Sequence, residues 1–79
     1  MKIEIITPDE NIFSGQASLI QLPGIDGSFE ILSNHAPMIS VLAKGKIKIK
    51  TEPEQKELFF EIKGGVIEVL ENKVLVLAE

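Results

Sequence analysis

The chain has 79 residues, of which 44% are hydrophobic, 25% are charged and only four are aromatic, a balance typical of a globular domain. It has no cysteine, which excludes disulfide bonds, thiolate metal sites and cysteine nucleophiles. Its net charge of −4 has the wrong sign for binding the phosphate backbone of nucleic acids. The longest apolar run, at 74–78, is far shorter than the ~20 residues of a spanning helix, and the N-terminus carries no export signal, so we expect neither a membrane-spanning nor an exported protein.

Isoleucine and valine dominate the apolar residues, and they alternate with polar residues, as in Ile47–Lys48–Ile49, which favours strands over helices. Turn-forming residues interrupt this pattern at short intervals. We therefore expect an all-β sandwich or small, flattened barrel of roughly eight to ten short strands. The expected strands, in chain order, are 2–6, 11–13, 16–22, 28–32, 38–42, 46–51, 56–63, 66–70 and 73–78.

The last two expected strands, 66–70 and 73–78, are apolar on both faces. Either the fold encloses them on two sides, or one of their faces meets a partner. The pattern alone does not separate these two alternatives.

Residues that could carry chemistry are few. His35 is the only histidine, so we expect no metal site, and no nucleophile motif surrounds it. The glycines of Gly24–Ser28 lack the lysine and the helix of a phosphate-binding loop, which indicates a turn and no cofactor site. The lysines at positions 44, 46, 48 and 50 predict a solvated strand face, with a docking stripe for an acidic partner as the alternative.

Several short motifs occur together in a specific order: Phe13-Ser14-Gly15, Leu22-Pro23-Gly24, His35-Ala36-Pro37, Gly64-Gly65 and Asn72-Lys73-Val74. In their order and spacing they resemble the N-terminal domain of the epsilon subunit of the rotary ATP synthase. The resemblance covers essentially the whole chain and implies a single domain over residues 1–79, built as a sandwich of two antiparallel sheets without an active site or cofactor.

The resemblance also implies a role and a location. A domain of this family is a non-catalytic rotor subunit of the central stalk, where it links the gamma subunit to the c-ring and couples proton flow to ATP synthesis. It is held peripherally at the cytoplasmic face of the bacterial inner membrane. The family's usual C-terminal helical hairpin is absent from this sequence, so we expect neither a hairpin-type brake on ATP hydrolysis nor ATP binding.

Contact residues follow from their positions in the family pattern. The residues expected to touch the c-ring, together at one end of the sandwich, are Asp26, Gly27, Ser28, Asn34 and His35. The residues expected to face gamma are Thr7, Met38 and Ser40, with Ile6 and the apolar strands near the C-terminus. The family commonly has Gly where this chain has Glu30, and Pro-Gly where it has Ser33–Asn34, which predicts a differently shaped loop before His35. It often has an acidic residue where this chain has Ser28, which predicts a neutral hydrogen bond in place of a charged contact.

Two other functions are weighed against this one. Small β-domains that carry biotin or lipoyl on a hairpin lysine are similar in length and strand content, and Lys73 would be the modified residue. The Met-Lys-Met context of a biotinylated hairpin is missing, which favours a plain turn lysine. The other alternative is a free-standing β-domain that binds a ligand in a cleft between Gly24–Ser28 and His35.

Overall fold

The structure, a computed structural model, describes residues 1–79 and consists of eight strands joined by turns and loops. The strands are β1 (Lys2–Ile6), β2 (Asn11–Gly24), β3 (Gly27–Leu32), β4 (Met38–Leu42), β5 (Gly45–Thr51), β6 (Glu57–Ile62), β7 (Gly65–Leu70) and β8 (Lys73–Ala78). No helix long and apolar enough to cross a membrane is present. The structure contains eight strands and no helix, so the expected all-β fold class is confirmed.

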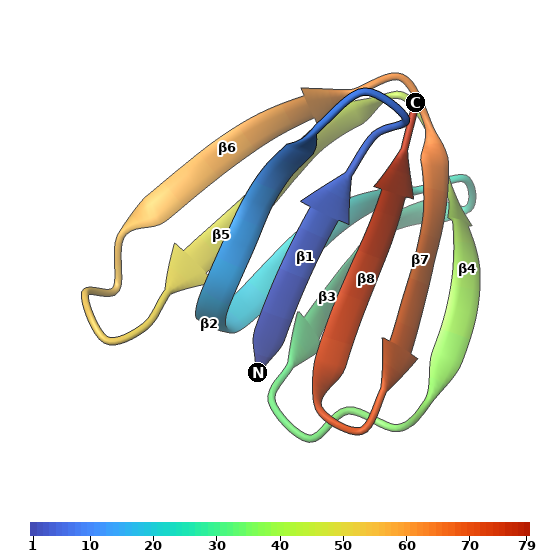
Figure 1. The fold of residues 1–79 in the computed structure, drawn as a ribbon. Helices are drawn as coiled ribbons and strands as arrows, with labels where there is room; N and C mark the ends of the chain where they lie inside the picture. The colour runs from blue at the N-terminus through green and yellow to red at the C-terminus, as the bar shows by residue number, and fades with distance from the viewer.

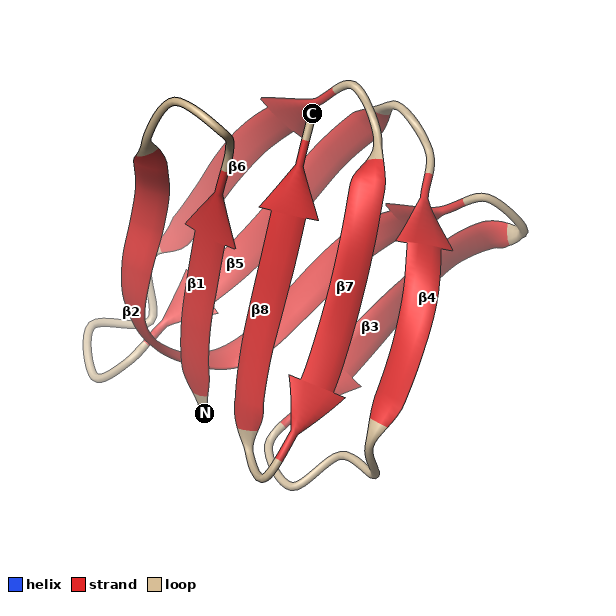
Figure 2. Ribbon diagram, turned by 45° about the vertical axis from the view of Figure 1, so that its right-hand side comes forward, coloured by secondary structure: helices blue, strands red, loops and turns tan.

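The strands form one hydrogen-bonded sheet that folds over into two layers (Figure 1). The first layer has the strand order β1–β8–β7–β4, and in the second layer β2 lies between β3 and β5, with β6 at the edge (Figure 2). All pairings are antiparallel except that of β1 with β8, which is parallel and was not expected. The tight β7–β8 turn sets the direction of β8, and β1 then pairs along the free side of β8.

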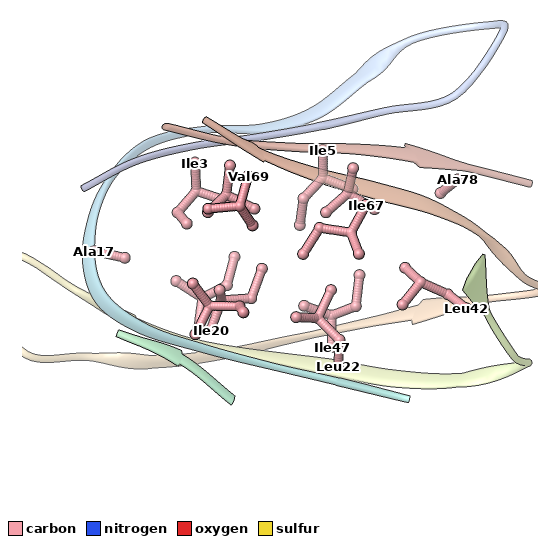
Figure 3. Close-up of a cluster of buried hydrophobic side chains, with 14 of the residues drawn as sticks. Ile3, Ile5, Ala17, Ile20, Leu22, Leu42, Ile47, Ile67, Val69 and Ala78 are labelled. Atoms are coloured by element: carbon pink, nitrogen blue, oxygen red, sulfur yellow. The ribbon is translucent and has the colours of Figure 1, made fainter. Parts of the chain in front are cut away.

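Strand β2 joins the two layers. The sequence predicted two strands, 11–13 and 16–22, with a turn at Ser14–Gly15 between them, but the structure has one strand of 14 residues. Its first part pairs with β1 and its second part with β3 and β5. The register with β5 shifts between Ala17 and Leu19, and Ala17 is fully buried where the strand curves from one layer to the other (Figure 3). A bulge bends a strand without ending it. Ser14 and Gly15 form no turn because they pair regularly with Glu4 and Ile3 of β1.

The core lies between the two layers and is entirely apolar. Sixteen buried residues form one cluster, to which both layers contribute alternate side chains, such as Ile5 and Ile67 from one layer and Ile20 and Ile47 from the other (Figure 3). No polar or charged side chain is buried. Alternation therefore assigns the inward side chains of every strand to one core, and the remaining side chains define the outer surfaces.

Candidate interaction surface

The outward side of the first layer carries a continuous apolar surface. Along β4, β7 and β8 every second side chain points away from the core, and most of these side chains are apolar. We call this surface the apolar face. Its members are Ile6, Ile39, Val41, Val66, Leu70, Leu75 and Leu77.

Strand register brings these side chains side by side. One row across the four strands is entirely apolar and consists of Val41, Val66, Leu77 and Ile6. In the next row Ile39 and Leu75 lie on either side of Glu68. Of the eight large hydrophobic side chains exposed in the chain, five belong to this face. A contiguous apolar surface marks an interaction site, whereas single exposed hydrophobic residues need no explanation.

The two alternatives for strands 66–70 and 73–78 are now resolved for the isolated chain. Their inner side chains are in the core, whereas Val66, Leu70 and Leu77 on the outer side are 38%, 50% and 49% exposed. The sequence pattern indicated this surface on β7 and β8. It did not indicate Ile39 and Val41 on β4, whose outward direction depends on strand register.

The structure does not bring together the three residues expected to face gamma. Met38 and Ser40 are half-buried and alternate along β4 with the exposed Ile39 and Val41. Thr7 follows β1, which β7 and β8 separate from β4. Successive side chains point to opposite sides of a strand. Met38 and Ser40 therefore point to the core side of β4, whereas Ile39 and Val41 point outward.

The residues expected at the c-ring form two groups, and the expectation that they lie together is wrong. Asp26–Ser28 belong to the β2–β3 turn and the start of β3, whereas Asn34 and His35 lie in the loop that follows β3. The six residues of β3 separate the two groups. At about 3.3 Å per residue this strand spans roughly 20 Å, so the groups occupy opposite ends of the fold (Figure 2).

Each group is held by its own hydrogen bonds. At the β2–β3 turn the side-chain amide of Gln21 donates to the hydroxyl of Ser28 at 3.3 Å. At the other end the backbone N–H of Asn34 donates to Oδ1 of Asn72 at 2.8 Å, which ties the loop after β3 to the β7–β8 turn. His35 donates from Nδ1 to the carbonyl oxygen of Ala36 at 2.7 Å, a local role within its loop.

Thr7, in the turn after β1, has a structural role. The Thr7 hydroxyl accepts hydrogen bonds from the backbone N–H groups of Asp9 and Glu10, at 3.3 and 3.2 Å. This side chain therefore stabilises the connection to β2. It also borders a hollow that includes Ile6 and Leu77, so it lies at the rim of the apolar face.

The lysines of β5 lie on the outer side of the second layer. Lys46 is paired with Glu61 of β6, and Lys50 is paired with Glu57. These cross-strand positions of opposite charge support the interpretation of a solvated strand face.

The remaining candidate sites occupy separate places. Lys73 is the first residue of β8, where it is paired with Leu70, so it lies beside the two-residue turn and not at its tip. The cleft expected between Gly24–Ser28 and His35 is not formed, because these segments are at opposite ends of β3 and neither lines a pocket. No three His, Asp or Glu side chains are grouped so that they could hold a metal ion.

A two-layered all-β fold with one contiguous apolar face is typical of a small interaction domain. Over residues 1–79 the chain matches the family described as ATP synthase, delta/epsilon chain, beta-sandwich domain. The chain therefore belongs to this family, and the expected relationship is confirmed.

Individual relatives agree with this assignment. The chain is 41% identical over 86 residues to the ATP synthase epsilon chain of Salinibacter ruber, covering 100% of this chain and 58% of the relative. It is 38% identical to the ATP synthase epsilon chain of Chlorobium limicola, covering 99% of this chain and 88% of the relative. The chain thus spans little more than half of the first relative and most of the second.

Solved structures show the same fold. A chain of the Euglena gracilis mitochondrial ATP synthase, determined by cryo-EM as OSCP/F1/c-ring, superposes with a TM-score of 0.86 at 21% identity, over 96% of this chain and 48% of that chain. A chain of the Tetrahymena thermophila mitochondrial ATP synthase, determined as central stalk/c-ring, gives a TM-score of 0.80 at 24% identity, over 99% and 62%.

Proposed function

We propose that this chain is a non-catalytic subunit of the central stalk of a proton-translocating ATP synthase, in which it links the gamma subunit to the c-ring and couples proton flow to ATP synthesis. Residues 1–79 act in it as one domain. Its partners hold it peripherally at the cytoplasmic face of the bacterial inner membrane. Family membership and the two bacterial epsilon chains support this proposal.

The observation that carries the proposal is the apolar face. A rotor component must transmit torque without slipping, so it needs an extended contact on a stiff support. The first layer supplies such a support, because each of its central strands is paired on both sides. Fully burying a large apolar side chain stabilises by about 1.5–3 kcal/mol, so covering the half-exposed members of this face offers several kcal/mol toward association before its costs.

The expected gamma residues have different places in this contact. Thr7 borders the hollow beside Ile6, and Met38 lines a hollow with Ile39 at the other side of the face, so both belong to its rim. Ser40 points toward the core side of β4, between the outward Ile39 and Val41. We place the centre of the gamma contact on the outward side chains.

One end of the sandwich rests on the c-ring in this proposal. Asp26–Ser28 and the loop with Asn34 and His35 are at opposite ends of β3, so we assign the contact to one of the two groups. We propose the β2–β3 turn, since it extends beyond the layers (Figure 2) and its Ile25 is 61% exposed. Disulfide cross-linking of Ser28→Cys, and not of His35→Cys, to a cysteine in the polar loop of the c subunit is expected.

The gamma contact is tested with two leucines of similar exposure on opposite sides of the sandwich. Leu77 on the apolar face is 49% exposed, and Leu32 on the second layer is 55% exposed. Leu77→Glu is expected to weaken binding to the gamma subunit at least thirtyfold, about 2 kcal/mol, because a carboxylate would be desolvated in the contact. Leu32→Glu is expected to change the affinity less than threefold.

Titration calorimetry with the cognate gamma subunit measures both affinities, and thermal unfolding checks that both variants remain folded. Equal affinities would show that the apolar face is not the gamma contact. Recovery of the chain in a complex that lacks gamma and c subunits would contradict the proposed function as a whole.

A further inference from the structure

Glu68 is a charged side chain placed among apolar ones. It lies on β7, and its outward side chain is exposed. Its neighbours on the same side of the sheet, two along β7 and two across to β4 and β8, are all apolar. They are Val66, Leu70, Ile39 and Leu75. The only ion pair in the chain, between the Met1 ammonium and Glu52, lies elsewhere. Lys73, diagonally across on β8, lines one hollow with Glu68 but forms no ion pair with it.

The surface hollows of the apolar face meet at Glu68. It lines one hollow with Ile39 and Leu77, a second with Met38 and Leu70, and a third that reaches toward the β7–β8 turn. A partner surface that fills these hollows therefore covers the Glu68 carboxylate as well. The carboxylate is hydrated in the free chain and would lose water in the complex.

An unpaired carboxylate inside an apolar contact is costly, because its lost hydration is not replaced. A cation from the partner removes most of this cost if it also satisfies the carboxylate oxygens by hydrogen bonds. A guanidinium group does this best, because its planar fork donates to both oxygens at once and it is more weakly hydrated than an ammonium group.

We propose that Glu68 receives an arginine side chain of the protein that covers the apolar face, and that this pair selects the partner and fixes its register on the sheet. The inference rests on the proposed function, in which that partner is the gamma subunit. Apolar side chains around the pair exclude water, so a partner that lacks the arginine meets an uncompensated carboxylate. The surface that fits is an apolar strip with one guanidinium near its centre.

Glu4 provides a control within the same row of the sheet. It lies across Leu75 from Glu68, on β1. Lys73 on β8 lies diagonally across from both glutamates and lines one hollow with them, but Lys2, two residues before Glu4 on β1, is a direct neighbour of Glu4 alone. Glu4 therefore has a lysine among its direct neighbours on the sheet, whereas the four direct neighbours of Glu68 are all apolar, so we expect Glu4 to need no cation from the partner.

The test replaces each glutamate with methionine, which keeps an unbranched side chain and removes the charge. If an arginine faces Glu68, Glu68→Met leaves that cation unpaired and weakens binding to the gamma subunit at least tenfold, about 1.4 kcal/mol. If no cation faces it, Glu68→Met removes a desolvation cost and leaves binding equal or tighter. The two cases therefore differ in the sign of the effect, and equal or tighter binding would overturn the inference. Glu4→Met is expected to change the affinity less than threefold, and a loss equal to that of Glu68→Met would also overturn it.

A charge swap identifies the partner residue. Glu68→Arg is expected to weaken binding at least a hundredfold, and changing one exposed arginine of gamma to glutamate should restore at least tenfold of this loss. If no arginine of gamma restores it, the inference is wrong. Leu77→Glu separates the two levels of the proposal: if it weakens binding while Glu68→Met does not, the face is right and the Glu68 pair is not.

A second copy of the chain is the other occupant to be tested. Sedimentation of the chain alone is expected to show a monomer, because face-to-face packing about an axis along the strands would bring Glu68 opposite Glu68. A dimer that Leu77→Glu dissociates, with gamma binding unchanged, would overturn the inference.

Discussion

The two layers of the sandwich are alike inside and different outside. The fully buried side chains on both layers are mostly isoleucine, leucine and valine, and they join one core. Outward side chains on the first layer form the apolar face, whereas those on β5 and β6 of the second layer include Lys46, Lys50, Glu57 and Glu61. Folding requires apolar side chains on the inner sides of both layers. It does not require them on the outer sides, so the difference in polarity between the two outer sides reflects what the protein binds.

The contrast is largest where a single strand has both kinds of position. On β4, Ser40 is half-buried on the core side, opposite the fully buried Ile67, whereas Val41 is 50% exposed on the apolar face. Ser40→Glu is expected to lower the free energy of unfolding by about 3 kcal/mol, because a carboxylate would enter an apolar core. Val41→Glu is expected to change it by no more than about 0.5 kcal/mol and to weaken binding to gamma instead.

Chemical denaturation of both variants, with the gamma affinity of Val41→Glu, checks this pair. Equal stability losses would show that β4 does not divide core from surface in this way, and the apolar face would then have to be redrawn without β4.

The next largest effect concerns the backbone that shapes the apolar face. Gly65 has φ of 149°, and a Cβ there would lie 2.3 Å from the carbonyl oxygen of Leu77. Gly65→Ala is expected to cost about 2–3 kcal/mol of stability, since the β7–β8 pair must shift. Gly27 on the second layer has φ of 127° but open space around a Cβ, so Gly27→Ala is expected to cost only about 1 kcal/mol. Thermal unfolding that ranked the two alanine variants in the reverse order would refute this account.

Sequence reasoning predicted the inner sides of the strands well, because alternation such as Ile47–Lys48–Ile49 is a local signal. It did not predict that β2 continues through Ser14–Gly15, or that β1 pairs with β8 in parallel. Both depend on which strands are neighbours in space, and local residue patterns do not encode that. The structure has eight strands, within the expected range, and apart from β2 the bounds expected from alternation and turn residues are approximately correct.

The candidate site was only partly accessible from sequence for the same reason. Apolar residues on both faces of β7 and β8 indicated a partner surface. The choice of Ser40 on β4, next to the outward Val41, shows that position in a family pattern does not give the direction of a side chain. The grouping of Ser28 with His35 was wrong. The two residues are close in sequence, but Ser28 is near the start of β3 and His35 follows its end, so they lie far apart in space.

A smaller effect is expected from an aromatic contact between β2 and β6. The rings of Phe13 on β2 and Phe60 on β6 lie 5.7 Å apart between centroids, tilted by 51°. A double-mutant cycle with Phe13→Leu and Phe60→Leu is expected to give a coupling free energy of about 0.5–1.5 kcal/mol, measured by denaturant unfolding. The coupling should be independent of gamma, because both side chains pack against the core. A coupling near zero would mean that the two layers are held together by the central core alone.

The smallest expected effect is on the outer side of the second layer. Lys48 is paired with Gln21 on β2 and with Phe59 on β6, so it has no charged neighbour directly across either strand. Lys48→Glu is therefore expected to change the free energy of unfolding by no more than about 0.5 kcal/mol and the gamma affinity by less than twofold. The same substitution tests the alternative that these lysines dock an acidic partner, because a reversed charge would slow such an association, most strongly at low salt. A tenfold loss of affinity for gamma that disappears at high salt would show that both outer faces of the sandwich bind gamma. The lysine face would then bind by charge attraction, and the apolar face by burial of apolar side chains.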